Sequence, residues 1–255
     1  MLAQAAETIE LLVTVKAYPA LGRRTGEAVC VAGVRVDTDE PEWVRLFPIP
    51  FRELPYDVRF RKYDLVRLSV RPSADARRES LDPIVDTIEV VGHYDTRNNW
   101  ADRRTTMGAL PLMTTCGLRR QDPIEHTLAW VRPREVFDFL IEERDPGQDH
   151  GYGRQLLNQA QGTLFGDRLE VIPYSFKYHY VCEAARCNGH RQSTIDWEAG
   201  QLWRRVRDRP NWEELMRDKF LDQMCADGRD VRFYLGNQQR YPRGFLVLGV
   251  WWPRA

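Results

Sequence analysis

The sequence predicts an α+β fold: an N-terminal β-rich small barrel or curled sheet, then a C-terminal α+β part with a cysteine–histidine knuckle, two helices and a final β-hairpin. Three observations predict this order. Short segments rich in β-branched and aromatic residues follow one another through the first ninety residues. Two cysteines and a histidine cluster near residue 185. The clearest helical periodicity comes only after that cluster.

Five segments of the N-terminal part predict strands, because each is short and is bounded by turns rich in Gly, Pro, Asp or Arg. These segments are residues 8–16, 27–36, 43–49, 63–70 and 84–91. Their spacing is typical of a small barrel or curled sheet. Pro48 and Pro50 cannot donate to a sheet ladder, so the third strand ends there or runs at an edge.

The middle of the chain holds the predicted domain boundary. Pro133 suits the first residue of a helix over 134–143. Gly, Pro and Asp concentrate in residues 144–153, which predicts a linker. We therefore expect a β-rich barrel-like domain at residues 1–145 and an α+β domain at residues 146–255, which can pack as one unit.

The C-terminal part predicts two helices. Ser193 and Asp196 form a capping box for a helix over 193–206. Asn211 can cap a second helix that ends near residue 226. The last predicted element is a hairpin of residues 231–235 and 245–251 around a loop at 236–244. The sequence has no internal repeat of fixed period.

The sharpest chemical feature is the spacing Cys182-x4-Cys187-x2-His190. Cys182 would lie at the end of a strand, and a tight turn would bring Cys187 back beside it. Gly189 can adopt the backbone conformation that directs the His190 side chain toward the two cysteines. Thiolates and imidazoles are zinc ligands, so the spacing predicts a zinc knuckle with a structural role. The fourth ligand is open among three residues: His179, Cys225 and Cys116. The competing interpretation is that both cysteines are simply small buried residues.

Composition and motifs exclude several classes of protein. Five widely spread cysteines argue against a secreted disulfide framework. No apolar run is long enough to cross a membrane, and Glu7 and Glu10 interrupt the segment where a signal peptide would be apolar. We therefore expect a cytoplasmic protein with reduced thiols and no membrane partner. The sequence lacks five known motifs, those of phosphate-binding loops, dinucleotide-binding folds, zincins, hydrolase nucleophile elbows and zinc deaminases.

Arginine dominates the basic residues. The chain has 37 basic and 37 acidic residues, and only four of the basic ones are lysines. Arginine suits phosphates and base edges, and several arginine clusters stand beside aromatic residues that can stack on bases. Because the net charge is zero, contact with nucleic acid must come from a local patch. We predict a nucleic-acid-binding protein, for DNA or RNA and including modified bases, with Arg52, Arg61, Asn237 and Arg240 as the binding residues.

Two alternatives stay open. The first is an enzyme acting on a base or nucleotide, of the hydrolase, glycosylase or nuclease type, with His93, Asp95 or Glu198 as acid or base. A deep pocket with one of these residues at its floor would support it. The second is a scaffold subunit that binds other proteins, which would expose an apolar patch instead.

Four motifs together resemble a family of uncharacterised bacterial proteins. They are Lys16-Ala-Tyr-Pro19, Trp43-Val-Arg-Leu-Phe-Pro48 with Phe51-Arg52, the Cys182/Cys187/His190 cluster running into Asp196-Trp-Glu198, and Gly236-Asn237. The segments span nearly the whole chain. The resemblance implies an association with DNA modification or phage defence, and it carries no established activity onto these residues.

Overall fold

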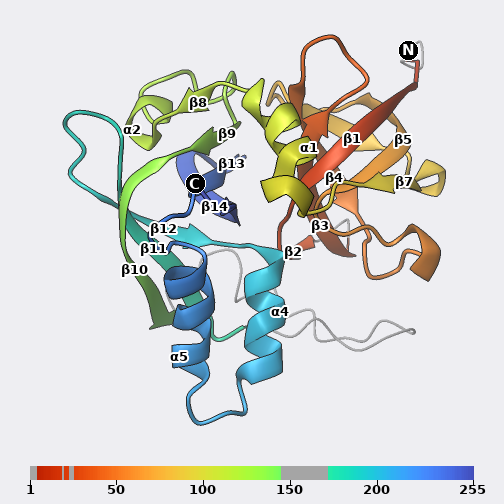
Figure 1. The fold of residues 1–255 in the computed structure, drawn as a ribbon. Helices are drawn as coiled ribbons and strands as arrows, with labels where there is room; N and C mark the ends of the chain where they lie inside the picture. Colours follow the sequence, from red (N-terminus) through yellow and green to blue (C-terminus); the bar gives the residue numbers. More distant parts are fainter. Residues whose placement is uncertain (1–4, 19, 23–25, 145–171) are drawn as a thin grey trace.

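The computed structural model describes residues 5–18, 20–22, 26–144 and 172–255, and it is mostly β (Figure 1). The linker predicted at residues 144–153 lies outside this part of the chain from residue 145 onward. Within the described residues, no helix has the length and apolar character needed to cross a bilayer.

The N-terminal half forms a closed five-stranded barrel, which confirms the β-rich barrel predicted from the strand spacing. The barrel strands are β1 (Glu7–Lys16), β3 (Gly26–Arg35), β4 (Glu42–Ile49), β5 (Asp64–Pro72) and β6 (Ser80–Pro83). Two further strands, β2 (Ala20–Gly22) and β7 (Glu89–His93), pair with β3 and β5, and the connections contain the short helical turns η1 (Tyr56–Val58) and η2 (Val85–Thr87). The strands follow the order β1-β3-β4-β6-β5, and β5 pairs back with β1 to close the barrel. Only β4 and β6 run parallel among these pairs. Numbered within the barrel, the order is 1-2-3-5-4-1, the arrangement of an OB-type Greek-key barrel.

The second sheet has the same strand order. Its elements are β8 (Leu112–Met113), β9 (Leu128–Val131), β10 (Pro133–Glu143), β11 (Tyr174–Cys182), β12 (His190–Thr194), β13 (Arg232–Gln238) and β14 (Tyr241–Trp251). Only Arg132 separates β9 from β10, so the two form one bent strand whose first part pairs with β13 and whose second part pairs with β11. The order (β9–β10)-β11-β12-β14-β13 then closes on itself, with β12 and β14 parallel. The two barrels therefore share one strand topology, although the sequence contains no repeat of fixed period.

The helices lie outside the two barrels. They are α1 (Arg97–Gly108) and α2 (Thr115–Leu118) between the barrels in the chain, then α4 (Trp197–Val206), α5 (Trp212–Arg217) and the π-helical turn η3 (Asp218–Gln223) between β12 and β13. Figure 1 shows α4 and α5 side by side below the second barrel. Asp196 caps α4, because its side chain accepts a hydrogen bond from the Glu198 N–H at 3.0 Å. The two predicted helices are thus confirmed, with the first starting at Trp197 because Ser193 belongs to β12.

Two sequence-based expectations differ from the structure. The helix predicted over 134–143 is wrong, because this segment is the strand β10. Phe139 is buried and Phe137 exposed, which is the period of two of a strand, and β11 supplies the hydrogen-bonding partner. The final hairpin is present, but its strands continue through the predicted loop to a turn at Gln239 and Arg240. The second sheet begins at Leu112, and the domain division expected at residue 145 stays a prediction.

The two barrels share a core at their junction. On β1, Leu11 and Val13 point into the first barrel, whereas Leu12 and Val15 point outward and pack against the second barrel. Trp130 and Tyr234 are among the residues that meet them. A strand buried on both faces needs apolar residues at successive positions, which explains the nearly continuous apolar run of β1.

Candidate functional site

Four potential metal ligands meet at one point of the second barrel. Cys182 ends β11, Cys187 lies in the following turn, His190 begins β12, and Cys116 comes from α2. One ligand atom from each residue lies within 4.8 Å of the others. Gly189 has a φ of +94°, a conformation that side chains disfavour, and it turns the chain so that His190 faces the cysteines. These four residues can hold a metal ion.

The geometry of this Cys/His cluster suits a metal better than a disulfide. The Nε2 atom of His190 lies 3.2 Å from the Cys187 sulfur and 3.6 Å from the Cys116 sulfur. The cysteines are free thiols. Three sulfurs and one nitrogen within 4.8 Å of one another form a Cys3His set that could bind a metal ion. Cys182 and His190 are buried and the other two are half-buried, so the cluster is enclosed rather than open to a substrate.

The surroundings of the cluster set the charge that its ligands carry. Burial and the neighbouring thiols of Cys182 and Cys187 raise the pKa of Cys116 to about 11. Burial also opposes ionisation of Cys187, but backbone N–H groups of Cys182 and Gly189 outweigh it and lower the pKa of this thiol. Burial, with a contribution from Arg119, lowers the pKa of His190. His190 is therefore neutral at pH 7, as a metal ligand must be.

The fourth member of the cluster is Cys116, which was one of three candidates. Cys225 lies elsewhere, where its thiol donates to the Phe220 carbonyl oxygen and burial raises its pKa to about 12. His179 packs its ring against Phe137 at a centroid distance of 5.1 Å. Cys116 precedes β9, so the cluster joins the start of the second barrel to the turn between β11 and β12.

The four residues predicted to bind nucleic acid lie on two separate elements. Arg52 and Arg61 belong to the connection between β4 and β5, where Arg61 is 74% exposed and approaches Asp64 at 3.6 Å. Asn237 and Arg240 lie at the end of the β13–β14 hairpin. Arg240 is exposed, but Asn237 is buried and its amide donates to two backbone carbonyl oxygens, those of Pro123 and Pro242. The Asn237 side chain thus holds the hairpin in place.

The predicted acid–base residues lie at or near the junction of the barrels. The Nδ1 atom of His93 lies 2.6 Å from an Asp64 carboxylate oxygen. Asp95 pairs with Arg97, and hydrogen bonds from the Arg97 backbone and side chain lower the pKa of Asp95. Glu198 is 48% exposed and lies 3.5 Å from the Lys62 ammonium. Among the described residues, the cavities of about 770 and 230 Å³ are lined by other side chains than these three.

Two buried lysines, Lys16 and Lys62, lie near Asp196 and Glu198 and were not predicted as site residues. Lys62 makes a buried ion pair with Asp196, and the interaction with this carboxylate raises the pKa of the lysine despite its burial. Lys16 donates to the Phe60 carbonyl oxygen and lies over the Phe51 ring at 4.4 Å. Burial lowers the pKa of Lys16 to about 8. Their scarcity among 37 basic residues was a usable signal, because arginine elsewhere fills the surface positions.

A cavity of about 770 Å³ lies at the start of β10 and β13. We call it the arginine groove, after the five arginines that line it: Arg104, Arg132, Arg134, Arg229 and Arg232. Three acids share the lining, namely Glu135, Asp227 and Asp230. The lining side chains therefore carry two more positive than negative charges.

Charge within the arginine groove is unevenly distributed. The Asp230 carboxylate forms ion pairs with Arg104, Arg132 and Arg232, with nitrogen–oxygen distances of 3.4, 3.2 and 2.9 Å. Arg134 and Arg229 have no carboxylate partner in the part of the chain that the structure describes. These two guanidiniums are thus available to an anion.

An aromatic ring stands beside the arginine groove. Trp252 is only half-buried, with Arg229 at 5.0 Å and the Lys219 ammonium at 4.5 Å from its ring. The pairs Arg132/Arg134 and Arg229/Arg232 mark this site in the sequence. They were missed because only the pairing of β9 with β13 brings them together.

Two family models together match nearly the whole described chain. The model described as domain of unknown function DUF8757 matches residues 112–255, and the one described as domain of unknown function DUF8758 matches residues 7–109. The division between them coincides with the division between the two sheets. No curated protein matches the chain.

Several solved structures of DNA-binding proteins are similar at low identity. A replication protein A heterotrimer bound to ssDNA has a TM-score of 0.37 and 9% identity, with 91% of this chain and 44% of that chain covered. The Ifi202 HINa domain in complex with 20bp dsDNA has a TM-score of 0.31 and 10% identity, with 75% and 78% covered. A murine DNA binding protein bound with ds DNA has a TM-score of 0.31 and 8% identity, with 98% and 96% covered. The chain spans less than half the length of the replication protein A chain, and none of these scores is high enough to decide fold or function.

Proposed function

We propose that this chain, which belongs to the DUF8757 family through residues 112–255, is a nucleic-acid-binding protein that holds a phosphate backbone in its arginine groove. The observation that carries the proposal is the excess of arginine over acid in a cavity of about 770 Å³. Phosphate contacts provide most of the affinity of nucleic-acid-binding proteins, and arginine donates to phosphate oxygens in pairs. Arg134 and Arg229 supply these contacts in the proposal, with Trp252 beside them as a ring on which a base can stack.

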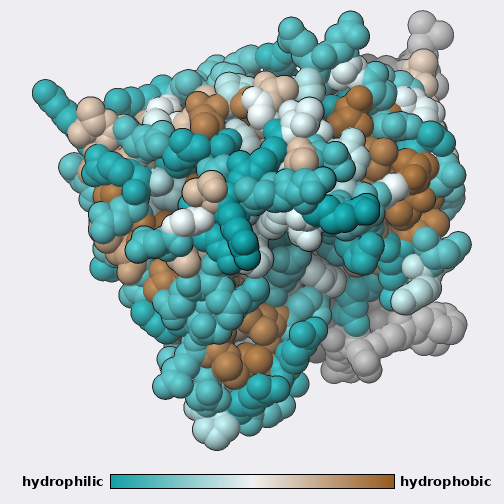
Figure 2. All heavy atoms as spheres, in the orientation of Figure 1, coloured by the Kyte–Doolittle hydropathy of each residue, from teal (hydrophilic) through white to brown (hydrophobic). Residues whose placement is uncertain are grey.

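The local nature of the charge fits a protein with zero net charge. A neutral chain does not attract nucleic acid over a long range, so its affinity depends on one basic site. Figure 2 shows hydrophobic residues on the face in view only as small separate patches in a hydrophilic surface. This face therefore offers no single large apolar patch of the kind that the scaffold hypothesis needs.

The second part of the proposal is one structural zinc ion at the Cys/His cluster. Sulfur-rich sites select zinc among the common divalent ions, and four enclosed protein ligands leave no open position for chemistry. The ion would fix α2 to the β11–β12 turn and so stabilise the second barrel. The role in DNA modification or phage defence that the motif resemblance implies gives the protein a biological setting in this proposal.

Fluorescence anisotropy with a labelled single-stranded oligonucleotide tests the proposed function. We expect the affinity to fall steeply between 50 and 200 mM salt, since each phosphate contact releases counterions (slope of log K about −0.7 per contact). Arg134→Glu/Arg229→Glu should weaken binding at least about tenfold and flatten the salt dependence. The control is Arg205→Glu/Arg209→Glu, which makes the same charge change at exposed arginines outside the arginine groove. Salt-insensitive binding, or equal loss in both double variants, would contradict the proposal.

A further inference from the structure

We propose that a crevice between the two barrels binds one unpaired nucleobase, which stacks on Phe47 and is recognised by Asp82 and Gln239. The crevice has a volume of about 230 Å³ and lies between the end of β4, the β5–β6 hairpin and the β13–β14 turn. It is smaller than the roughly 300–1,000 Å³ of pockets for drug-sized ligands, which suits a single flat ring. This inference takes its ligand class from the proposed function and concerns a different part of the molecule from the arginine groove.

The side chains around the crevice are free to bind a ligand. Phe47 is 38% exposed, an unusual state for a phenylalanine at the end of a barrel strand. The Asp82 carboxylate and the Gln239 amide make no hydrogen bond to any described residue. The buried Ser80 hydroxyl also lacks a partner in this part of the chain. An aromatic ring, a carboxylate and an amide therefore line one small space, with the Ser80 hydroxyl buried beside it.

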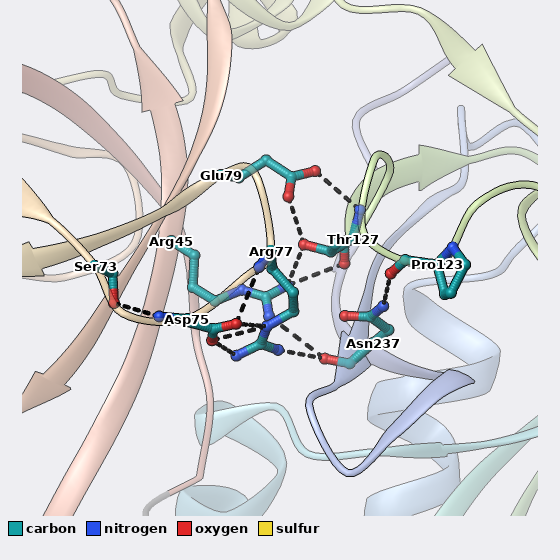
Figure 3. A network of polar contacts seen from close by, with 8 residues as sticks. All are labelled: Arg45, Ser73, Asp75, Arg77, Glu79, Pro123, Thr127 and Asn237. Atoms are coloured by element: carbon teal, nitrogen blue, oxygen red, sulfur yellow. Dashed lines mark hydrogen bonds and ion pairs between the residues drawn. The ribbon is translucent and has the colours of Figure 1, made fainter.

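A polar network holds the two walls of the crevice at a fixed separation (Figure 3). Arg45 of the first barrel donates to Thr127 of the second, to the carbonyl oxygen at 2.9 Å and to the hydroxyl at 3.1 Å. Glu79 accepts from the Thr127 N–H at 2.9 Å, and Arg77 donates to the Asn237 carbonyl oxygen at 3.0 Å. Asn237 in turn anchors the hairpin from which Gln239 projects. Asn237 is thus a positioning residue for this crevice, in place of the base contact that its sequence context predicts.

The charges around the crevice select the kind of ligand. Asp75, Asp82 and Arg45 line it; Asp75 is paired with Arg77, and the Arg45 guanidinium donates to Thr127. The free carboxylate of Asp82 repels a phosphate but accepts a hydrogen bond from an amino group. Aspartate accepts from the amino group of cytosine in direct base recognition, and a glutamine amide can donate and accept beside it. The crevice is therefore suited to a base with an exocyclic amino group.

Oligomers of deoxycytidine and deoxyuridine of equal length provide a matched test, because their bases differ in the amino and carbonyl groups. We expect the wild-type protein to bind the cytosine oligomer about tenfold more tightly. Asp82→Asn should remove this preference, and the ratio of the two affinities is unaffected by any general effect of the lost charge. Phe47→Ala should weaken binding of both oligomers by about tenfold, the usual contribution of one stacked base.

The outcomes separate this inference from the proposed function. If neither oligomer binds in a salt-sensitive manner, the proposed function is contradicted, and base binding in the crevice is contradicted with it. If both bind with a steep salt dependence but the ratio is near one, or if Asp82→Asn and Phe47→Ala behave as the wild type, only the crevice is overturned. The Arg134→Glu/Arg229→Glu variant should weaken binding of both oligomers and keep their ratio. Matching thermal unfolding curves establish that the variants are folded.

Discussion

The Lys62 ammonium lies 2.8 Å from a carboxylate oxygen of Asp196, and this buried ion pair joins the first barrel to the second. The pair is closely surrounded, because a Cβ atom at Gly249 would lie 3.0 Å from the Lys62 nitrogen. Removing one partner of a buried pair leaves an uncompensated charge, which costs about 3–5 kcal/mol.

We expect Asp196→Asn to lower the free energy of unfolding by about 3 kcal/mol, measured by urea denaturation. Asparagine can still cap α4, so the substitution removes the charge and retains the cap. Glu10→Gln is the control, because Glu10 pairs with Arg67 at the surface and such pairs contribute about 1 kcal/mol or less. Equal effects of the two substitutions would show that the Lys62–Asp196 pair does not hold the barrels together.

Burial of Lys16 makes the free energy of unfolding increase with pH, whereas a lysine paired with an acid makes it decrease. Its pKa falls from 10.5 to about 8 because of burial, so between these values the unfolded chain binds more protons than the folded one. Stability associated with Lys16 therefore rises as the pH rises. Relative to Lys16→Met, the wild type should gain about 2 kcal/mol in unfolding free energy between pH 7.5 and pH 9.5. A constant difference across this range would mean that Lys16 is not desolvated.

Gly200 marks the close approach of α4 to the segment that follows β1. A Cβ atom at this position would lie 2.3 Å from ring carbons of Tyr18, so Gly200→Ala should lower the unfolding free energy by about 1–3 kcal/mol. A Cβ atom at Gly108, near the end of α1, meets nothing within 4 Å. Gly108→Ala should be neutral or stabilise by up to about 1 kcal/mol. Denaturation curves in which the two glycines respond alike would argue against this packing of α4.

The Cys/His cluster should hold one zinc ion per chain. Elemental analysis of Cys187→Ser should show loss of the metal, whereas Cys225→Ala should retain it because Cys225 lies outside the cluster. Chelation should lower the unfolding free energy by about 3 kcal/mol or more, since a ligand at 100 times its Kd stabilises by about 2.7 kcal/mol. Wild-type protein that purifies without metal and is unaffected by zinc or chelator would refute the structural zinc.

Local pattern was enough to predict most of the secondary structure. Strand composition located the first barrel, and helical periodicity located α4 and α5 to within a few positions, although Ser193 lies in β12 and the Asn211 side chain makes no capping hydrogen bond. The helix expected at 134–143 failed because Pro133 is equally suited to start a strand, and only pairing with β11 decides between them. The repeat of one barrel topology could not be predicted, because it is a property of strand order and leaves no period in the sequence.

The site was predictable where its residues are neighbours in sequence. Cys182, Cys187 and His190 could be grouped from their spacing, but Cys116 is 66 residues from Cys182 and needs the fold to bring it there. Burial decides the role of Asn237, and burial at a junction between two barrels is not visible in a local pattern. The arginine groove went unnoticed for the same reason, since its arginines come from three segments.

Hydrogen–deuterium exchange with and without saturating single-stranded DNA tests the central claim most directly. Binding in the arginine groove predicts slowed exchange in residues 132–136 and 226–232, which form most of its lining. Saturated binding that leaves both segments unchanged, with protection confined to other parts of the chain, would contradict the account.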